Sequence, residues 1–115
     1  MSWELFVQDW GEYDALEDLP DDFEPKSIGK KSEIIEKLKC IEPSINFTDN
    51  SFGTLENEHF SIEISMGDEE ELYSFTMSIR GGKLAVPSIG NILSEMNLRA
   101  TDGSTPYFFD IEKFK

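Results

Sequence analysis

The chain lacks most of the residues by which an enzyme reveals its reaction. It has one histidine, one cysteine and no complete catalytic or cofactor motif. The single cysteine, Cys40, excludes an intramolecular disulfide. No apolar run approaches the roughly 20 residues of a membrane span, and the N-terminus shows neither the basic region nor the cleavage site of a signal peptide. These absences predict a soluble cytosolic protein that needs no membrane.

Basic residues are also missing from the first 25 positions, which carry nine of the 24 acidic residues. The formal net charge is −14, and residues 1–25 contribute −9 of it. Such a field repels nucleic-acid phosphates and anionic membrane surfaces, so neither is an expected partner. Hydrophobic residues make up 38% of the 115 positions, which excludes a disordered acidic tail. The length fits a single domain over residues 1–115.

Aromatic side chains alternate with the acids of this N-terminal segment, and residues 12–28 are predicted to form an acidic loop restrained by Pro20 and Pro25. Aromatic anchors in a negative field suit recognition of a basic surface. The alternative is that the acids only keep the protein soluble while the aromatics pack on the core. The residues assigned to partner binding are Trp10, Tyr13, Asp14, Glu17, Asp18, Asp21, Asp22 and Phe23.

Hydrophobic periodicity predicts the remaining elements. They are a strand over 2–10, a helix over 30–41, a β-hairpin over 59–80, a helix over 85–96 and a strand over 98–101. Residues 44–58 are predicted to form a loop, which could include a short strand at 45–48. Residues 103–115 form a C-terminal extension, either an edge strand or a tail docked by its aromatics.

The hairpin has one apolar and one polar face, since its hydrophobic residues alternate with serine, threonine and glutamate. The residues expected to be buried are Phe60, Ile62, Ile64, Met66, Tyr73, Phe75, Met77 and Ile79. The strand over 2–10 has apolar groups on both faces, so it is predicted to be covered on both. The order β-α-β-β-α-β predicts an α+β, ferredoxin-like two-layer sandwich, with two helices on one face of an antiparallel-rich sheet.

Three groups of residues deserve a test for chemistry. Cys40 and His59 could form a nucleophilic dyad, but nothing in the sequence brings them together. The acidic clusters do not match a calcium loop, so no metal and no cofactor are expected. The one basic, glycine-rich segment consists of Arg80, Gly81, Gly82 and Lys83. It is predicted to be a plain turn or a weak anion site, because no full phosphate motif is present.

Several segments resemble a family of small acidic bacterial proteins: SWELFVQDWG, LPDDFEP with SIGKKSEII, FSIEISMG and SIRGG. The resemblance covers most of the chain and brings no activity and no catalytic residue with it. More coarsely, by size and composition, the chain is similar to bacterial immunity proteins and antitoxins that neutralise a basic effector.

These features favour a non-enzymatic module, monomeric or a small homo-oligomer, whose acidic surface binds a basic protein. The alternative is a small enzyme or ligand-binding domain with its site near the polar sheet face and the Arg80–Lys83 turn. A concave site with convergent polar groups would favour the alternative, and a broad acidic face would favour the binding module.

Overall fold

The computed structural model describes residues 3–11, 13, 16–49, 51–102 and 108–110. Within them, six strands form one sheet in which every neighbouring pair is antiparallel. Across the sheet the strands are β3 (Asn46–Asp49), β4 (Phe52–Glu56), β5 (Ser61–Ser65), β7 (Ser74–Arg80), β1 (Trp3–Gln8) and β8 (Arg99–Asp102). A short two-stranded ribbon pairs β2 (Gly29–Lys30) with β6 (Glu71–Leu72).

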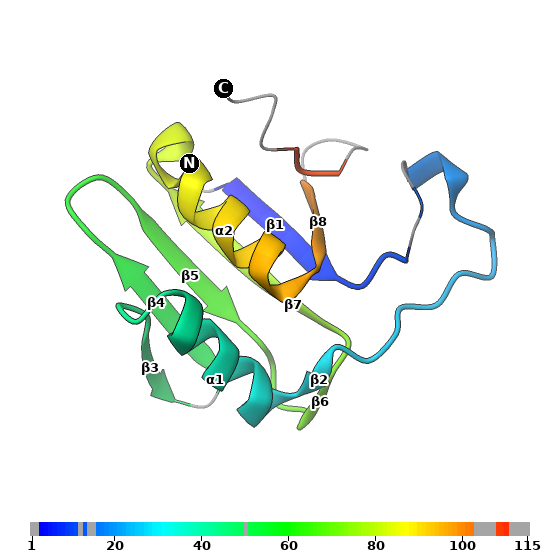
Figure 1. Cartoon of the computed structure of the whole chain (residues 1–115), viewed down its shortest axis with the longest axis horizontal. Helices are drawn as coiled ribbons and strands as arrows, with labels where there is room; N and C mark the ends of the chain where they lie inside the picture. The colour runs from blue at the N-terminus through cyan, green and yellow to red at the C-terminus, as the bar shows by residue number, and fades with distance from the viewer. Residues whose placement is uncertain (1–2, 12, 14–15, 50, 103–107, 111–115) are drawn as a thin grey trace.

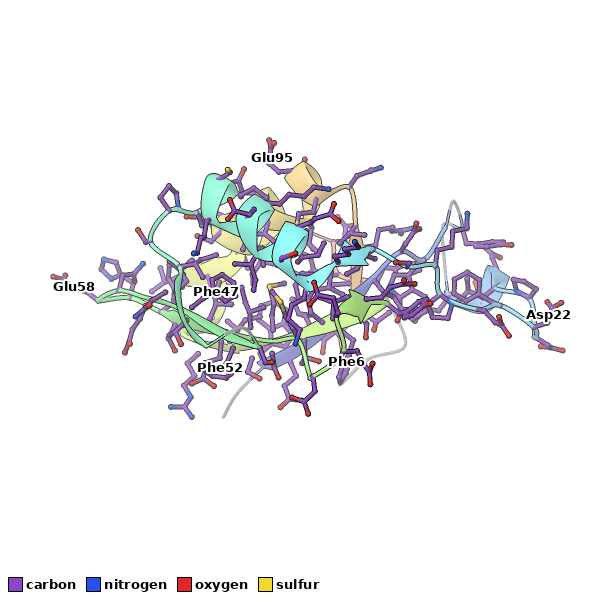
Figure 2. The ribbon with its side chains drawn as sticks, turned by 90° about the horizontal axis from the view of Figure 1, so that it is seen from below. Phe6, Asp22, Phe47, Phe52, Glu58 and Glu95 are labelled. Carbon is purple, nitrogen blue, oxygen red and sulfur yellow. The ribbon has the colours of Figure 1, made fainter. Side chains whose placement is uncertain are left out.

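Two helices, α1 (Lys31–Ile41) and α2 (Val86–Met96), cover the same face of the sheet (Figures 1 and 2). The buried side chains alternate along the strands, so that the apolar residue of each pair turns toward the helices. The core joins strand residues to helix residues, among them Leu5, Val7, Ile34, Leu38, Ile62, Ile64, Phe75, Met77, Ile79, Ile89 and Ile92. The predicted α+β class, with an antiparallel sheet and two helices on one face, is confirmed.

The connections give the sheet two interlocked parallel pairs. β1 and β5 run in the same direction with β7 between them, and α1 lies in the connection that joins them. β7 and β8 also run in the same direction, with β1 between them and α2 in their connection. The exact ferredoxin-like connectivity is not confirmed, because β3 and β4 are added between α1 and β5.

The hairpin of β3 and β4 occupies a stretch that the sequence predicts to be mostly loop. Gly53 suggests a break, yet it lies inside β4, opposite Phe47 of β3. A Cβ atom at position 53 would approach the Phe47 ring to 2.7 Å. The glycine is therefore required by the aromatic ring that crosses it, and not by a turn.

Two predictions of burial are wrong. Tyr73 is 50% exposed, because the chain bends between β6 and β7 and places Leu72 in the core instead. Phe6 is 41% exposed, because no described element covers the face of β1 that lies opposite the helices. Phe60 is only partly buried, whereas the other hairpin residues expected in the core are buried.

The C-terminal residues that the structure describes are docked by their aromatics, as one alternative predicts. Phe108 is buried and forms an isolated bridge with Thr101, while Phe109 packs on the core. The rest of the extension, residues 103–107 and 111–115, lies outside the described residues. Among the described helices, none has the length and apolar character needed to cross a membrane.

Candidate partner-binding surface

A closed loop follows β1 and projects from one end of the sheet (Figure 1). Its two ends are held together by an isolated bridge between Asp9 and Lys26. Gly11, with a φ of 76°, donates its N–H to the Asp9 carboxylate at 2.9 Å, which turns the chain away from the strand. The loop contains the short 3-10 helix η1 (Leu16–Asp18). We call residues 9–26 the acidic loop, since they hold eight acids and one base.

Aromatic rings hold the base of this loop. Trp10 stacks on Phe23 with ring centroids 6.0 Å apart and an interplanar angle of 8°. Tyr13 packs edge-on against Phe23, with ring centroids also 6.0 Å apart. Trp10 also contacts Phe108 edge-on at 5.6 Å. All three loop aromatics are partly buried, so they anchor the loop more than they offer themselves to a partner.

Arg99, which the sequence analysis does not single out, joins this aromatic cluster. Its guanidinium lies 3.7 Å from the centre of the Phe108 ring and donates a hydrogen bond to the Tyr13 carbonyl. Such a cation–π contact ties strand β8 to the loop. No motif in the sequence marks Arg99 for this role, because the hydrogen bond to Tyr13 joins residues far apart in the chain.

The acids of the loop face solvent. Glu17, Asp18, Asp21, Asp22 and Glu24 are all exposed. Within the described part of the chain none of them forms an ion pair or a side-chain hydrogen bond. Figure 2 places Asp22 at the far end of the loop, away from the sheet and the helices. Asp14, also assigned to partner binding, lies outside the described residues.

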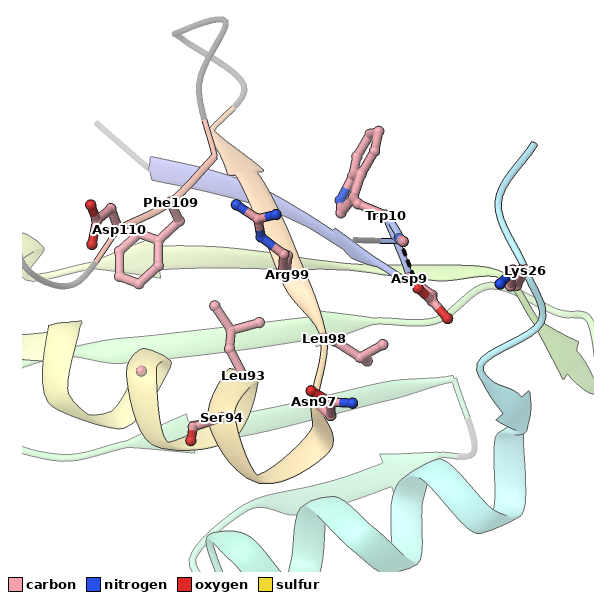
Figure 3. Close-up of a pocket in the computed structure, with 12 residues that line it drawn as sticks. Asp9, Trp10, Lys26, Leu93, Ser94, Asn97, Leu98, Arg99, Phe109 and Asp110 are labelled. Atoms are coloured by element: carbon pink, nitrogen blue, oxygen red, sulfur yellow. Dashed lines mark hydrogen bonds between the residues drawn. The ribbon is translucent and has the colours of Figure 1, made fainter. Parts of the chain in front are cut away.

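A cleft of about 670 Å³ opens beside the loop base (Figure 3). Its walls come from the end of β1, the last turns of α2 and the start of β8. Charged side chains of both signs line it, together with apolar ones: Asp9, Lys26, Arg99, Asp110, Trp10, Leu93, Leu98 and Phe109. The cleft is therefore concave and mixed in charge, and it lies away from the Arg80–Lys83 turn.

The turn at Arg80–Lys83 is a strand-to-helix connection. Gly81 and Gly82 have φ values of 102° and 54°, and Gly82 begins the 3-10 helix η2 (Gly82–Ala85) that leads into α2. A Cβ atom at Gly81 would lie 2.5 Å from the His59 carbonyl oxygen. These glycines are explained by backbone geometry and a close approach, so the weak anion site gains no support from their presence.

The other residues considered for chemistry remain apart. Cys40 is exposed on α1 and lines a shallow groove with Glu36, Lys37 and Glu95. His59 is exposed in the turn before β5, and no hydrogen bond links the described side chains of Cys40 and His59. In the described ranges, no group of three or more histidine, cysteine, aspartate or glutamate side chains is placed to hold a metal ion.

The face of the sheet opposite the helices is polar, as predicted for the hairpin. Strand pairing places one row of residues across it: Phe52, Ser65, Thr76, Phe6 and Thr101. A neighbouring row runs through Thr54, Glu63, Ser78 and Glu4. Hydroxyl groups therefore dominate the middle strands, and Figure 2 shows Phe6 and Phe52 on the side away from α1 and α2. We call this surface the open face.

Comparison with known proteins yields no match: no family model, no curated sequence and no solved structure resembles this chain at a significant level. The function is therefore inferred from the surfaces of the molecule itself.

Proposed function

We propose that the protein is a non-enzymatic binding module whose acidic loop recognises a basic protein, as an immunity-type inhibitor does. The observation that carries this proposal is a set of exposed carboxylates, without partner cations among the described residues, on a loop that is anchored at its base. Unpaired acids close together repel one another, which is unfavourable for the isolated protein. A basic partner relieves this repulsion and is attracted over a distance before contact.

The anchoring at the base supports the proposal in a second way. A loop already held by the Trp10–Phe23 stack and the Asp9–Lys26 bridge loses less conformational entropy on binding than a free chain. The acids are thus presented in a preorganised arrangement. This is the division of roles that we propose for the segment: aromatics position the loop and carboxylates meet the partner.

Charge reversal on the loop, compared with charge reversal elsewhere, tests the proposal. Each Asp→Lys or Glu→Lys change adds two positive charges, so a triple variant changes the net charge from −14 to −8. The test variant carries Asp18→Lys, Asp21→Lys and Asp22→Lys. The control variant changes three exposed acids outside the loop to lysine: Glu36 on α1, and Glu58 and Glu95, which Figure 2 shows far from Asp22.

Binding is measured against a partner recovered from the host with the wild-type protein. We expect the loop variant to bind at least about tenfold more weakly, because the attraction falls most where the charges face the partner. The control variant should lose much less, although its net charge is the same. Equal losses of affinity in both variants would mean that only the overall charge matters. No loss of affinity in either variant would mean that the acids only keep the protein soluble.

The cleft favours a second candidate function, the binding of a small polar molecule. Its opposite charges, from Asp9 and Lys26, would suit a ligand that carries both signs. A fragment screen by NMR is the appropriate test. Shifts concentrated at Gly90, Ser94 and Leu98 would support this function, and shifts scattered over the surface would argue against it.

We also propose that β5, β7, β1 and β8, with α1 and α2, are an elaborated ferredoxin-like core. The two interlocked pairs of parallel strands support this assignment. The β3–β4 hairpin is then an insertion that widens the sheet at the β5 edge. This matters for function because the insertion contributes Phe52 to the open face.

A further inference from the structure

We call the strip of the open face between Phe6 and Phe52 the trough. Phe6 on β1 and Phe52 on β4 stand at opposite ends of the row that contains Ser65 and Thr76. The two phenylalanines are separated by three strand spacings of about 4.8 Å each, or roughly 14 Å. On this face β7 carries Ser74, Thr76 and Ser78, with the exposed Arg80 at its end, and β5 adds Glu63 to its two serines.

The size of this trough matches an α-helix. A helix with its side chains is about 10–12 Å across, which is comparable to the roughly 14 Å between the strands that carry the two phenylalanines. Short hydroxyl side chains on the floor let a helix backbone approach the sheet closely. The two phenylalanines would then act as apolar rails that contact the helix from either side.

Charge decides which helix fits. Glu63 lies on the floor of the trough and Glu4 beside Phe6, and both are accessible, whereas the one base on this face of β5 and β7 is Arg80 at the end of β7. A second copy of this chain would bring another net charge of −14 to the surface, so self-association through this face is opposed. A helix with lysine or arginine beside an apolar stripe complements both the rails and the carboxylates.

Area links the trough to the acidic loop. Four strands and about five residues along each give a floor on the order of 350 Å², less than half of the roughly 800 Å² that each partner contributes to a typical interface. The loop begins directly after β1, the strand that carries Phe6, so both surfaces can meet one partner. We propose that a basic amphipathic helix of the partner lies along β5 and β7 between Phe6 and Phe52 while the acidic loop contacts the same partner, an inference that depends on the proposed function.

The test uses the full-length protein and a synthetic 18-residue peptide, designed to be helical, with lysines flanking an alanine and leucine stripe. NMR shifts should change at Ser65, Thr76 and Ser78 in a saturable manner. Thr76→Trp fills the trough and should raise the Kd of the peptide at least about tenfold. The control, Asn91→Trp, adds the same ring at an exposed position of α2 and should leave the Kd unchanged.

Phe6→Ser and Phe52→Ser remove the rails without adding bulk, so they test the trough even if Thr76→Trp proves unstable. Each should weaken binding of the peptide severalfold. A peptide with the same composition but a scrambled order should lose the shifts on β5 and β7. Failure to saturate at about 1 mM peptide, or equal binding of the scrambled peptide at this face, would overturn the trough.

The loop variant with Asp18, Asp21 and Asp22 changed to lysine separates this inference from the proposed function. If peptide binding depends on those acids but not on Thr76, Phe6 or Phe52, the trough is wrong and the acidic loop still stands. If peptide binding depends on the trough residues but not on the acids, the trough stands and the role of the loop is wrong. Independence from both sets would overturn both.

Discussion

Gly81 offers a sharp test of the fold at the turn between β7 and α2. Its φ of 102° is a conformation that residues with a Cβ atom rarely adopt, and the added atom would lie 2.5 Å from the His59 carbonyl oxygen and 2.7 Å from the Cβ of Phe60. Gly81→Ala therefore combines a backbone penalty of about 1–3 kcal/mol with an overlap penalty of about 1–3 kcal/mol. We expect a loss of about 3 kcal/mol or more in the free energy of unfolding.

Gly82→Ala is the matched control, one residue along. Gly82 has a φ of 54°, and its Cβ would meet nothing within 4 Å, so only the left-handed backbone penalty of about 1–2 kcal/mol applies. Urea denaturation followed by circular dichroism measures both losses. For a chain of this size the Tm should fall by roughly 4 °C per kcal/mol. Equal losses in the two variants would show that the turn does not pack against residues 59–60 as described.

Three further predictions concern the core, an exposed tyrosine and the candidate dyad. Phe75→Ala should cost about 3–5 kcal/mol of unfolding free energy in denaturation experiments, because the ring is buried between the sheet and the helices; a loss below 1 kcal/mol would contradict its place in the core. The hydrogen bond from the Tyr73 hydroxyl to Glu71 (2.8 Å), reinforced by the carboxylate charge, raises the pKa of Tyr73 above its usual value of 10.0. The stabilising effect of this contact is present below that usual pKa and is lost as the pH rises through the pKa of Tyr73. Glu71→Ala should therefore lower the pKa of Tyr73 in an ultraviolet titration, and an unchanged titration would rule the contact out. Cys40→Ser and His59→Gln should leave Tm and partner binding unchanged, and loss of binding in both, with the fold intact, would restore the dyad.

Much of the fold could be predicted because its signals are local. Alternation along β5 and β7 identifies the buried face, and Pro87 marks the first turn of α2. The β4 strand was missed because Gly53 resembles a loop residue, and its true cause is the Phe47 ring on a neighbouring strand. The alternation of β7 predicts a buried Tyr73, but the bend before Ser74 interrupts it.

The candidate site was predictable in its charge but not in its geometry. Composition alone identifies the acids of residues 9–26, and the exposed positions of Asp18, Asp21 and Asp22 agree with it. The anchoring of the loop could not be predicted, because Arg99 contacts Tyr13 and Phe108 contacts Trp10, residues far away along the chain. The cleft and the trough arise in the same way, from strand pairing that no local pattern encodes.

The salt dependence of the association rate is the decisive measurement for recognition through the acidic loop. Raising the ionic strength from about 0.01 M to about 0.15 M shortens the Debye length from about 30 Å to about 8 Å, which screens the exposed carboxylates. The wild-type protein should lose at least about tenfold in k_on with its basic partner over this range, with a smaller change in k_off. The variant with Asp18, Asp21 and Asp22 changed to lysine should show a much shallower dependence than the control with Glu36, Glu58 and Glu95 changed. Identical salt dependence in all three proteins would contradict recognition through the acidic loop.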